Sequence, residues 1–101
     1  MENPSDVAAL VDYQAGGIVS RQIVKKPTGN VTAFAFDASQ ELTEHTSSFD
    51  ALLHVLEGEA AVTVSDRAHT VSSGQMILLP ANVPHAVRAV TRFKMLLTMI
   101  R

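Results

Sequence analysis

The chain has 101 residues, a mass of 10.8 kDa, a formal net charge of −2 at pH 7, 47% hydrophobic residues and no cysteine. A chain of this length forms one domain, and its apolar content excludes a mainly disordered protein. Lys and Arg are scattered and aromatic residues make up only 5%, so we expect no nucleic-acid partner. The lack of cysteine excludes disulfides, thiolate metal sites and a cysteine nucleophile.

The first residues argue against export. Residues 1–6 are acidic and polar, without the basic and apolar regions of a signal peptide. No apolar run approaches the roughly 18 residues that a membrane span needs. We therefore expect a cytoplasmic protein that does not bind a membrane.

Short apolar segments separated by turn residues run through the chain. Residues 7–14 suit a short strand or one helical turn, and Gly16-Gly17 then interrupts the pattern. Between Asn30 and Ala38, Val31, Ala33 and Ala35 alternate with Thr32, Phe34 and Phe36, which is the period of a strand. Eight or nine strands at such spacing are typical of an all-β sandwich or barrel. The predicted strands lie within 18–24, 30–38, 41–48, 51–65 (two strands around Gly58), 68–72, 75–80, 85–90 and 93–100, and the segment 41–48 is polar and ends in a Ser-rich loop just after His45.

Some of these strands are apolar on both faces, most clearly 75–79 and 95–100. A chain of this length has too few elements to cover both faces of every strand. An exposed apolar patch of that size usually marks an interface. We therefore expect a homodimer that buries outer-face side chains, with contributions from Met95–Ile100 and Ile18–Val24.

Two spaced motifs resemble those of the cupin family. The first is His45-x-Ser47-x₃-Ala51-x₆-Gly58, within residues 45–58, and the second is Gly74-x₅-Pro80-x-Asn82-x₂-His85-x₃-Ala89, within 74–89. The resemblance implies a small single-domain cupin of the RmlC-like type, covering residues 1–101 with an N-terminal arm at 1–16. Its fold would be an all-β double-stranded β-helix, or jelly-roll barrel.

The resemblance also implies a metal site, but an incomplete one. Metal-binding cupins use two His and one Glu from the first motif and one His from the second. Here His45 and His85 are kept, while Ser47 and Ala51 stand at the other two positions. Two imidazoles hold Fe, Mn, Ni or Zn weakly compared with a complete set. Without metal, the pair would titrate near neutral pH and could bind an anion.

Further contributors to this shell are Ser47, Asp50 and His54. Ser47 shares strand parity with His45, so we expect it to line the same pocket. Asp50 would need a local bulge to turn inward, and alternation from Ala51 directs His54 away from the pocket unless a bulge reverses it. His69 lies beside a turn and is expected on the surface. The remaining predicted pocket residues are Phe34, Phe36, Ala51, Leu53 and Val87.

Two functions fit this sequence. The first is a small-molecule-binding cupin, with or without a divalent metal at His45 and His85. The alternative is a metal-dependent enzyme, a dioxygenase or isomerase, acting on a small organic acid or phenolic substrate. A sugar epimerase of cupin fold would pair a His base with a Tyr acid, but the only tyrosine, Tyr13, lies outside both motifs.

Overall fold

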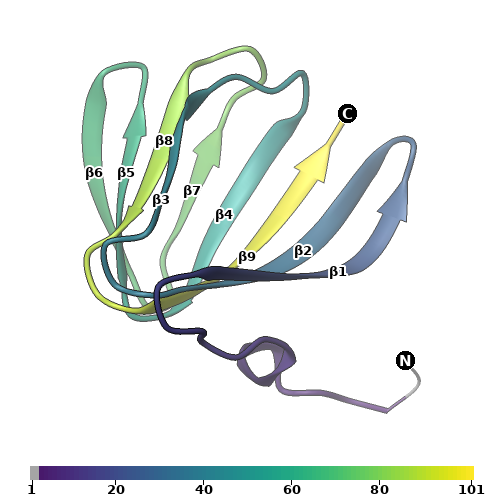
Figure 1. Cartoon of the computed structure of the whole chain (residues 1–101). Coiled ribbons are helices and arrows are strands. Elements are labelled where there is room, and N and C mark those ends of the chain that lie inside the picture. The colour runs from purple at the N-terminus through teal and green to yellow at the C-terminus, as the bar shows by residue number, and fades with distance from the viewer. Residues whose placement is uncertain (1–2) are drawn as a thin grey trace.

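A computed structural model describes residues 3–101, in which nine strands follow a short N-terminal arm (Figure 1). The arm contains one 3₁₀ turn, η1, at the segment for which the sequence suits either a short strand or a helical turn. Among the described residues, no helix is long and apolar enough to span a bilayer. The elements are η1 Val7–Leu10, β1 Ile18–Lys26, β2 Gly29–Phe36, β3 Glu41–His45, β4 Asp50–Glu57, β5 Glu59–Val64, β6 Arg67–Ser72, β7 Met76–Leu79, β8 His85–Ala89 and β9 Phe93–Ile100.

The strands form two antiparallel sheets that face each other. One sheet has the order β1-β2-β9-β4-β7, and the other has the order β3-β8-β5-β6 (Figure 1). Non-consecutive neighbours such as β2 and β9 show that the chain crosses repeatedly between the sheets. This is the predicted all-β jelly roll, and the fold expectation is confirmed.

The core lies between the two sheets because alternate residues of each strand point inward. Phe36 and Phe93 stack there with ring centroids 4.6 Å apart. In β2, Phe34 and Phe36 face the core while Ala33 and Ala35 pack against a second cluster on the outer face, as the alternation predicted. The inner core contains Phe36, Ala51, Leu53, Val55, Ala60, Val62, Val71, Leu79, Val87, Ala89, Phe93 and Met95.

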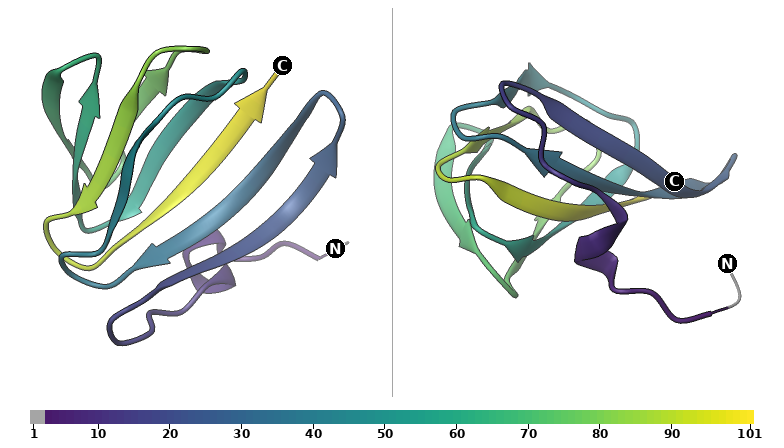
Figure 2. Two further views of the ribbon diagram at one scale, coloured as in Figure 1. Left: turned by 45° about the horizontal axis from the view of Figure 1, so that its top comes forward. Right: turned by 60° about the horizontal axis from the view of Figure 1, so that its bottom comes forward.

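The N-terminal arm covers part of the outer face of the five-stranded sheet. Val11 is buried against Ala33 and Ala35, and Tyr13 and Leu96 are half-buried beside them. Figure 2 shows the arm outside the sheets, with its helical turn near one end of the strands. The arm therefore closes only one end of this face.

Candidate functional site

The two motif histidines meet at one end of the four-stranded sheet. His45 ends β3, His85 begins β8, and the two are register partners in the antiparallel ladder. Their Nε2 atoms are 3.1 Å apart, and their rings meet edge-on at 70°. His85 is 6% exposed, whereas His45 is exposed. The structure thus brings together the predicted pair, with one ring buried and the other open to solvent.

The other nitrogen of each ring fixes the tautomer. His45 Nδ1 lies 2.7 Å from the Thr43 carbonyl oxygen, and His85 Nδ1 lies 3.1 Å from the Val83 carbonyl oxygen. A carbonyl oxygen only accepts hydrogen bonds, so each Nδ1 carries the proton and donates it. In the neutral ring Nε2 then carries a lone pair. Two nitrogens with lone pairs therefore lie 3.1 Å apart, close enough to share a proton or a metal cation.

The loops beside the pair are tied together by backbone hydrogen bonds. The Asn82 amide donates to the Ser47 carbonyl at 2.7 Å, which joins the loop after β3 to the loop before β8. The Ser65 amide donates to the Pro84 carbonyl at 2.9 Å. These bonds fix the chain on both sides of the histidines. Strand β3 ends at His45, just before the Ser-rich loop that the sequence predicts.

Burial is the main influence on the buried histidine. It lowers the pKa of His85, and the neighbouring His45 lowers that pKa further, while the hydrogen bond to Val83 opposes both effects. The lowered pKa keeps the His85 ring neutral near pH 7. A neutral imidazole is the form that binds a metal ion.

Ser47, Asp50 and His54, the further residues expected at the metal site, do not join the two histidines. Ser47 Oγ accepts a hydrogen bond from the Phe49 amide at 3.1 Å, so it stabilises its own loop. Asp50 Oδ1 accepts one from the Ala81 amide at 2.8 Å, and its register partner Ile100 places it on the outer face. His54 is exposed and points away from the pair. Within residues 3–101, no three His, Asp or Glu side chains come together in a way that could hold a metal ion.

The predicted pocket residues belong largely to the packed core. Phe36 and Leu53 are fully buried, and Ala51 and Val87 are nearly so. Phe34 is half-buried and packs against this core. Ala51, at the position where the resemblance expects a carboxylate, is part of the core cluster. A ligand cavity among these residues stays a prediction.

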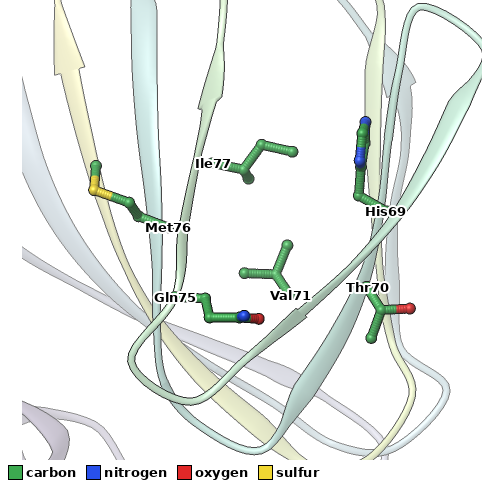
Figure 3. Close-up of a pocket in the computed structure, with 6 residues that line it drawn as sticks. All are labelled: His69, Thr70, Val71, Gln75, Met76 and Ile77. Atoms are coloured by element: carbon green, nitrogen blue, oxygen red, sulfur yellow. The ribbon is translucent and has the colours of Figure 1, made fainter.

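A hollow of about 400 Å³ opens between the edge strands β6 and β7 (Figure 3). His69 lines it with Val71 and Ile77, while Met76 points to the other side of β7. His69 is exposed, as predicted. Its register partner Val62 is buried in the core, so His69 lies on the face of β6 that is turned towards the other sheet. The shared parity of His69 and Val71 was the signal that could have shown this.

Comparison with known proteins then identifies the family. The sequence model of the cupin domain matches residues 33–101. The chain belongs to the cupin family. A conserved protein of unknown function from Streptococcus pyogenes is 33% identical, with a TM-score of 0.96 over 100% of this chain and 89% of its own. A cupin superfamily protein from Desulfitobacterium hafniense is 25% identical, with a TM-score of 0.94 over 99% of this chain and 92% of its own.

A more distant structural neighbour is an enzyme. Salicylate 1,2-dioxygenase from Pseudoaminobacter salicylatoxidans is 22% identical and has a TM-score of 0.77 over 85% of this cupin and 25% of its own chain. At that identity the likeness is one of fold. No curated protein sequence matches this cupin. The comparisons therefore establish the family, and the chemistry rests on the residues of this chain.

Proposed function

We propose that this cupin binds a small oxygen-bearing molecule at His45 and His85, through a weakly held divalent metal ion such as Fe, Mn, Ni or Zn. The observation that carries the proposal is the pair of Nε2 lone pairs that converge at 3.1 Å, each backed by a donated Nδ1 proton. A hydrogen bond from Nδ1 to a backbone carbonyl is the usual support of a metal-ligating imidazole.

The separation of the nitrogens fits one shared ion. Two nitrogens that each lie about 2.1 Å from a metal are roughly 3.0–3.4 Å apart at angles between 90° and tetrahedral. The observed 3.1 Å falls within that range. The main chain therefore already holds the two donors in a chelating position.

The missing carboxylate indicates the ligand class. With Ala51 in its place, the protein contributes two neutral nitrogens and no negative charge to the ion. The remaining positions are open to water or to an anionic oxygen. A carboxylate or phenolate ligand would supply the charge that the chain lacks. Metal and ligand should therefore bind cooperatively.

No observation favours the enzyme alternative over binding. A dioxygenase of the Fe(II) type uses two histidines and one carboxylate around the ion. The carboxylate next to the Ala51 position, Asp50, accepts a hydrogen bond from the Ala81 amide on the outer face. The same His45–His85 pair would serve an isomerase, but within residues 3–101 no third His, Asp or Glu joins the pair in a group that could hold a metal ion.

Titration calorimetry of the untagged, metal-free protein with Zn²⁺ or Ni²⁺ tests this proposal. We expect one ion per pair of histidines, with binding lost in His45→Ala and in His85→Ala. His54→Ala is the matched control, because His54 is exposed on the outer face, and it should bind normally. Added benzoate should tighten metal binding, because its carboxylate completes the shell.

Two results would contradict the proposal. Metal binding that survives both alanine substitutions would place the ion elsewhere. No binding at millimolar metal would leave a proton between the rings as the explanation of their approach. In that case benzoate alone should bind at acidic pH, when the pair carries a positive charge.

A further inference from the structure

The side of the molecule between strands β6 and β7 contains the hollow that His69 lines. Within residues 3–101, β6 is an edge strand of the four-stranded sheet and β7 is an edge strand of the five-stranded sheet. The sandwich is therefore open along this side, and the hollow of about 400 Å³ lies in the opening. Its volume falls within the range of roughly 300–1,000 Å³ that is typical of small-molecule sites.

The floor of this hollow is apolar. Val71 of β6 is only 4% exposed and belongs to the core, and Ile77 of β7 is half-buried and packs against the same core. Figure 3 shows both side chains extending into the space between the two strands, whereas Met76 points away from it. A ligand chain that lies on these two residues would remove apolar surface from water, which favours binding.

The turn between β6 and β7 closes one end of the hollow. The Ser72 amide donates a hydrogen bond to Gln75 Oε1 at 2.8 Å, and the Gln75 amide donates to the Ser72 carbonyl oxygen at 2.9 Å. The Gly74 amide donates to the Val55 carbonyl oxygen at 2.8 Å, which ties the turn to β4. These bonds lie within the protein itself, so the turn needs no ligand to become ordered and binding does not have to offset that cost.

The other end of the hollow carries positive charge. Alternation along β6 places Arg67 and His69 on the same face as Val71, which is the face turned towards the other sheet. Both side chains are exposed, and within residues 3–101 no carboxylate forms an ion pair with Arg67. The two side chains begin about 7 Å apart along the strand, close enough to contact the two oxygens of one carboxylate.

Two roles are open to such inward-pointing charges. On an edge strand they hinder pairing with another chain, but that role requires neither an apolar floor nor space beside the charges. A ligand with an apolar chain and an anionic end uses all of these features. From Val71 to Arg67 the strand advances about 13 Å, which suits a linear molecule that lies along it.

We propose that this hollow binds an aliphatic monocarboxylate of medium chain length. Its chain lies on Val71 and Ile77, and its carboxylate contacts the guanidinium of Arg67 and the ring of His69. Arg67 suits this contact because its planar guanidinium donates two parallel hydrogen bonds to a carboxylate. The site does not depend on the metal site proposed above.

Calorimetric titration of the metal-free full chain with octanoate at pH 7 tests the proposal. We expect one octanoate per chain, with affinity falling by up to about fourfold for each methylene removed between octanoate and butyrate. Octanol should bind about tenfold more weakly, because it lacks the charge that Arg67 recognises. In an NMR titration the amide signals of residues 67–71 and 75–77 should shift.

Three variants locate the site. Arg67→Gln should weaken octanoate binding about tenfold, because it removes the charged donor. Arg88→Gln is the matched control: it removes the same charge from the same sheet, but Arg88 pairs with Ala61 on the outer face, so this variant should bind normally. Ile77→Trp fills the hollow and should abolish binding, and circular dichroism checks that it stays folded.

Three results would overturn the site. A wild type that does not bind octanoate at millimolar concentration would leave protection of the edge strand as the role of the charges. Equal weakening in Arg67→Gln and Arg88→Gln would show only a general attraction of anions. Binding lost in the double variant His45→Ala/His85→Ala, but kept in Arg67→Gln, would place octanoate at the histidine pair. Failure of the chain to bind a metal would contradict the proposed function and leave this test unaffected.

Discussion

At the residue scale, the cupin motif predicts which histidines meet, but not how they are held. Spacing placed His45 and His85 together, and strand alternation sent His54 outward. The donated Nδ1 protons, to Thr43 and Val83, depend on ring rotation and loop shape. Neither follows from residue type. His69 shows the opposite case. Strand alternation places it on the same face as Val71, which the sequence could have shown, but its position next to a turn led only to the expectation of a surface residue.

Gly58 illustrates a residue that the motif does explain. It connects β4 and β5 with φ +80, and a Cβ there would collide with the Arg92 carbonyl and with Phe93. Gly58→Ala should therefore destabilise the protein by more than about 2 kcal/mol, since a left-handed backbone and a backbone clash combine. Urea unfolding measures the loss.

Gly74→Ala is the matched control for Gly58→Ala. Gly74 also has a positive φ, of +84, but a Cβ added there would meet no neighbouring atom within 4 Å. Its substitution should cost only about 1 kcal/mol, from the backbone conformation alone. Equal losses at the two glycines would show that the collision at Gly58 is relieved by local movement.

Asp37 should make stability depend on acid pH. Its carboxylate accepts hydrogen bonds from the Gly16 amide, Arg92 and the Ala38 amide, which lower its pKa to about 2. An unfolded Asp titrates near pH 3.9. Because the folded pKa is the lower one, this contribution is complete above about pH 4 and is lost as the pH falls towards 2.

The test compares the wild type with Asp37→Asn by urea unfolding at pH 6, 4 and 2.5. The wild type should be the more stable at pH 6, and the difference should shrink as the pH falls. A difference that stays constant over this range would mean that the Asp37 contacts do not depend on its charge.

At the element scale, period-two alternation predicts strands well because burial on one face imposes it. Strand β2 follows it throughout, with phenylalanines inward and alanines outward. The arm was ambiguous because its conformation depends on what it packs against. Its contacts are long-range: the Tyr13 hydroxyl donates to Glu57 at 2.7 Å, and Lys94 Nζ donates to the Ala8 carbonyl at 2.6 Å.

Tyr13→Phe should loosen the arm without unfolding the barrel. Burial and the Glu57 carboxylate raise the pKa of Tyr13, so its hydroxyl stays protonated and donates. Loss of this bond to a charged acceptor should cost about 1–2 kcal/mol. Hydrogen exchange should show faster exchange in residues 7–13 and unchanged exchange in β4 and β9. Asp12→Asn, which changes the exposed residue next to Tyr13, should alter neither the exchange of residues 7–13 nor that of the two strands.

At the scale of the whole molecule, strand count and turn spacing predicted the jelly roll, and the motifs predicted the family. The order of strands within each sheet did not follow from the sequence, because it is set by pairings between distant segments such as β2 with β9. That order decides which apolar residues share an outer face. The surplus of apolar residues was visible in the sequence. Only the register shows that Leu78, Leu52, Thr98, Val31 and Val24 form one row across the outer face of the five-stranded sheet.

The homodimer that the sequence predicts would couple folding to protein concentration. Because the folded dimer dissociates on unfolding, a tenfold rise in concentration stabilises it by about 1.4 kcal/mol. For a dimer of this size the thermal midpoint should then rise by roughly 3–6 °C per tenfold. Differential scanning fluorimetry with an extrinsic dye, between 2 and 200 μM, measures this rise. Leu78→Glu would place a charge on the exposed outer face of the five-stranded sheet and should remove this dependence. A wild-type midpoint independent of concentration would contradict the predicted homodimer.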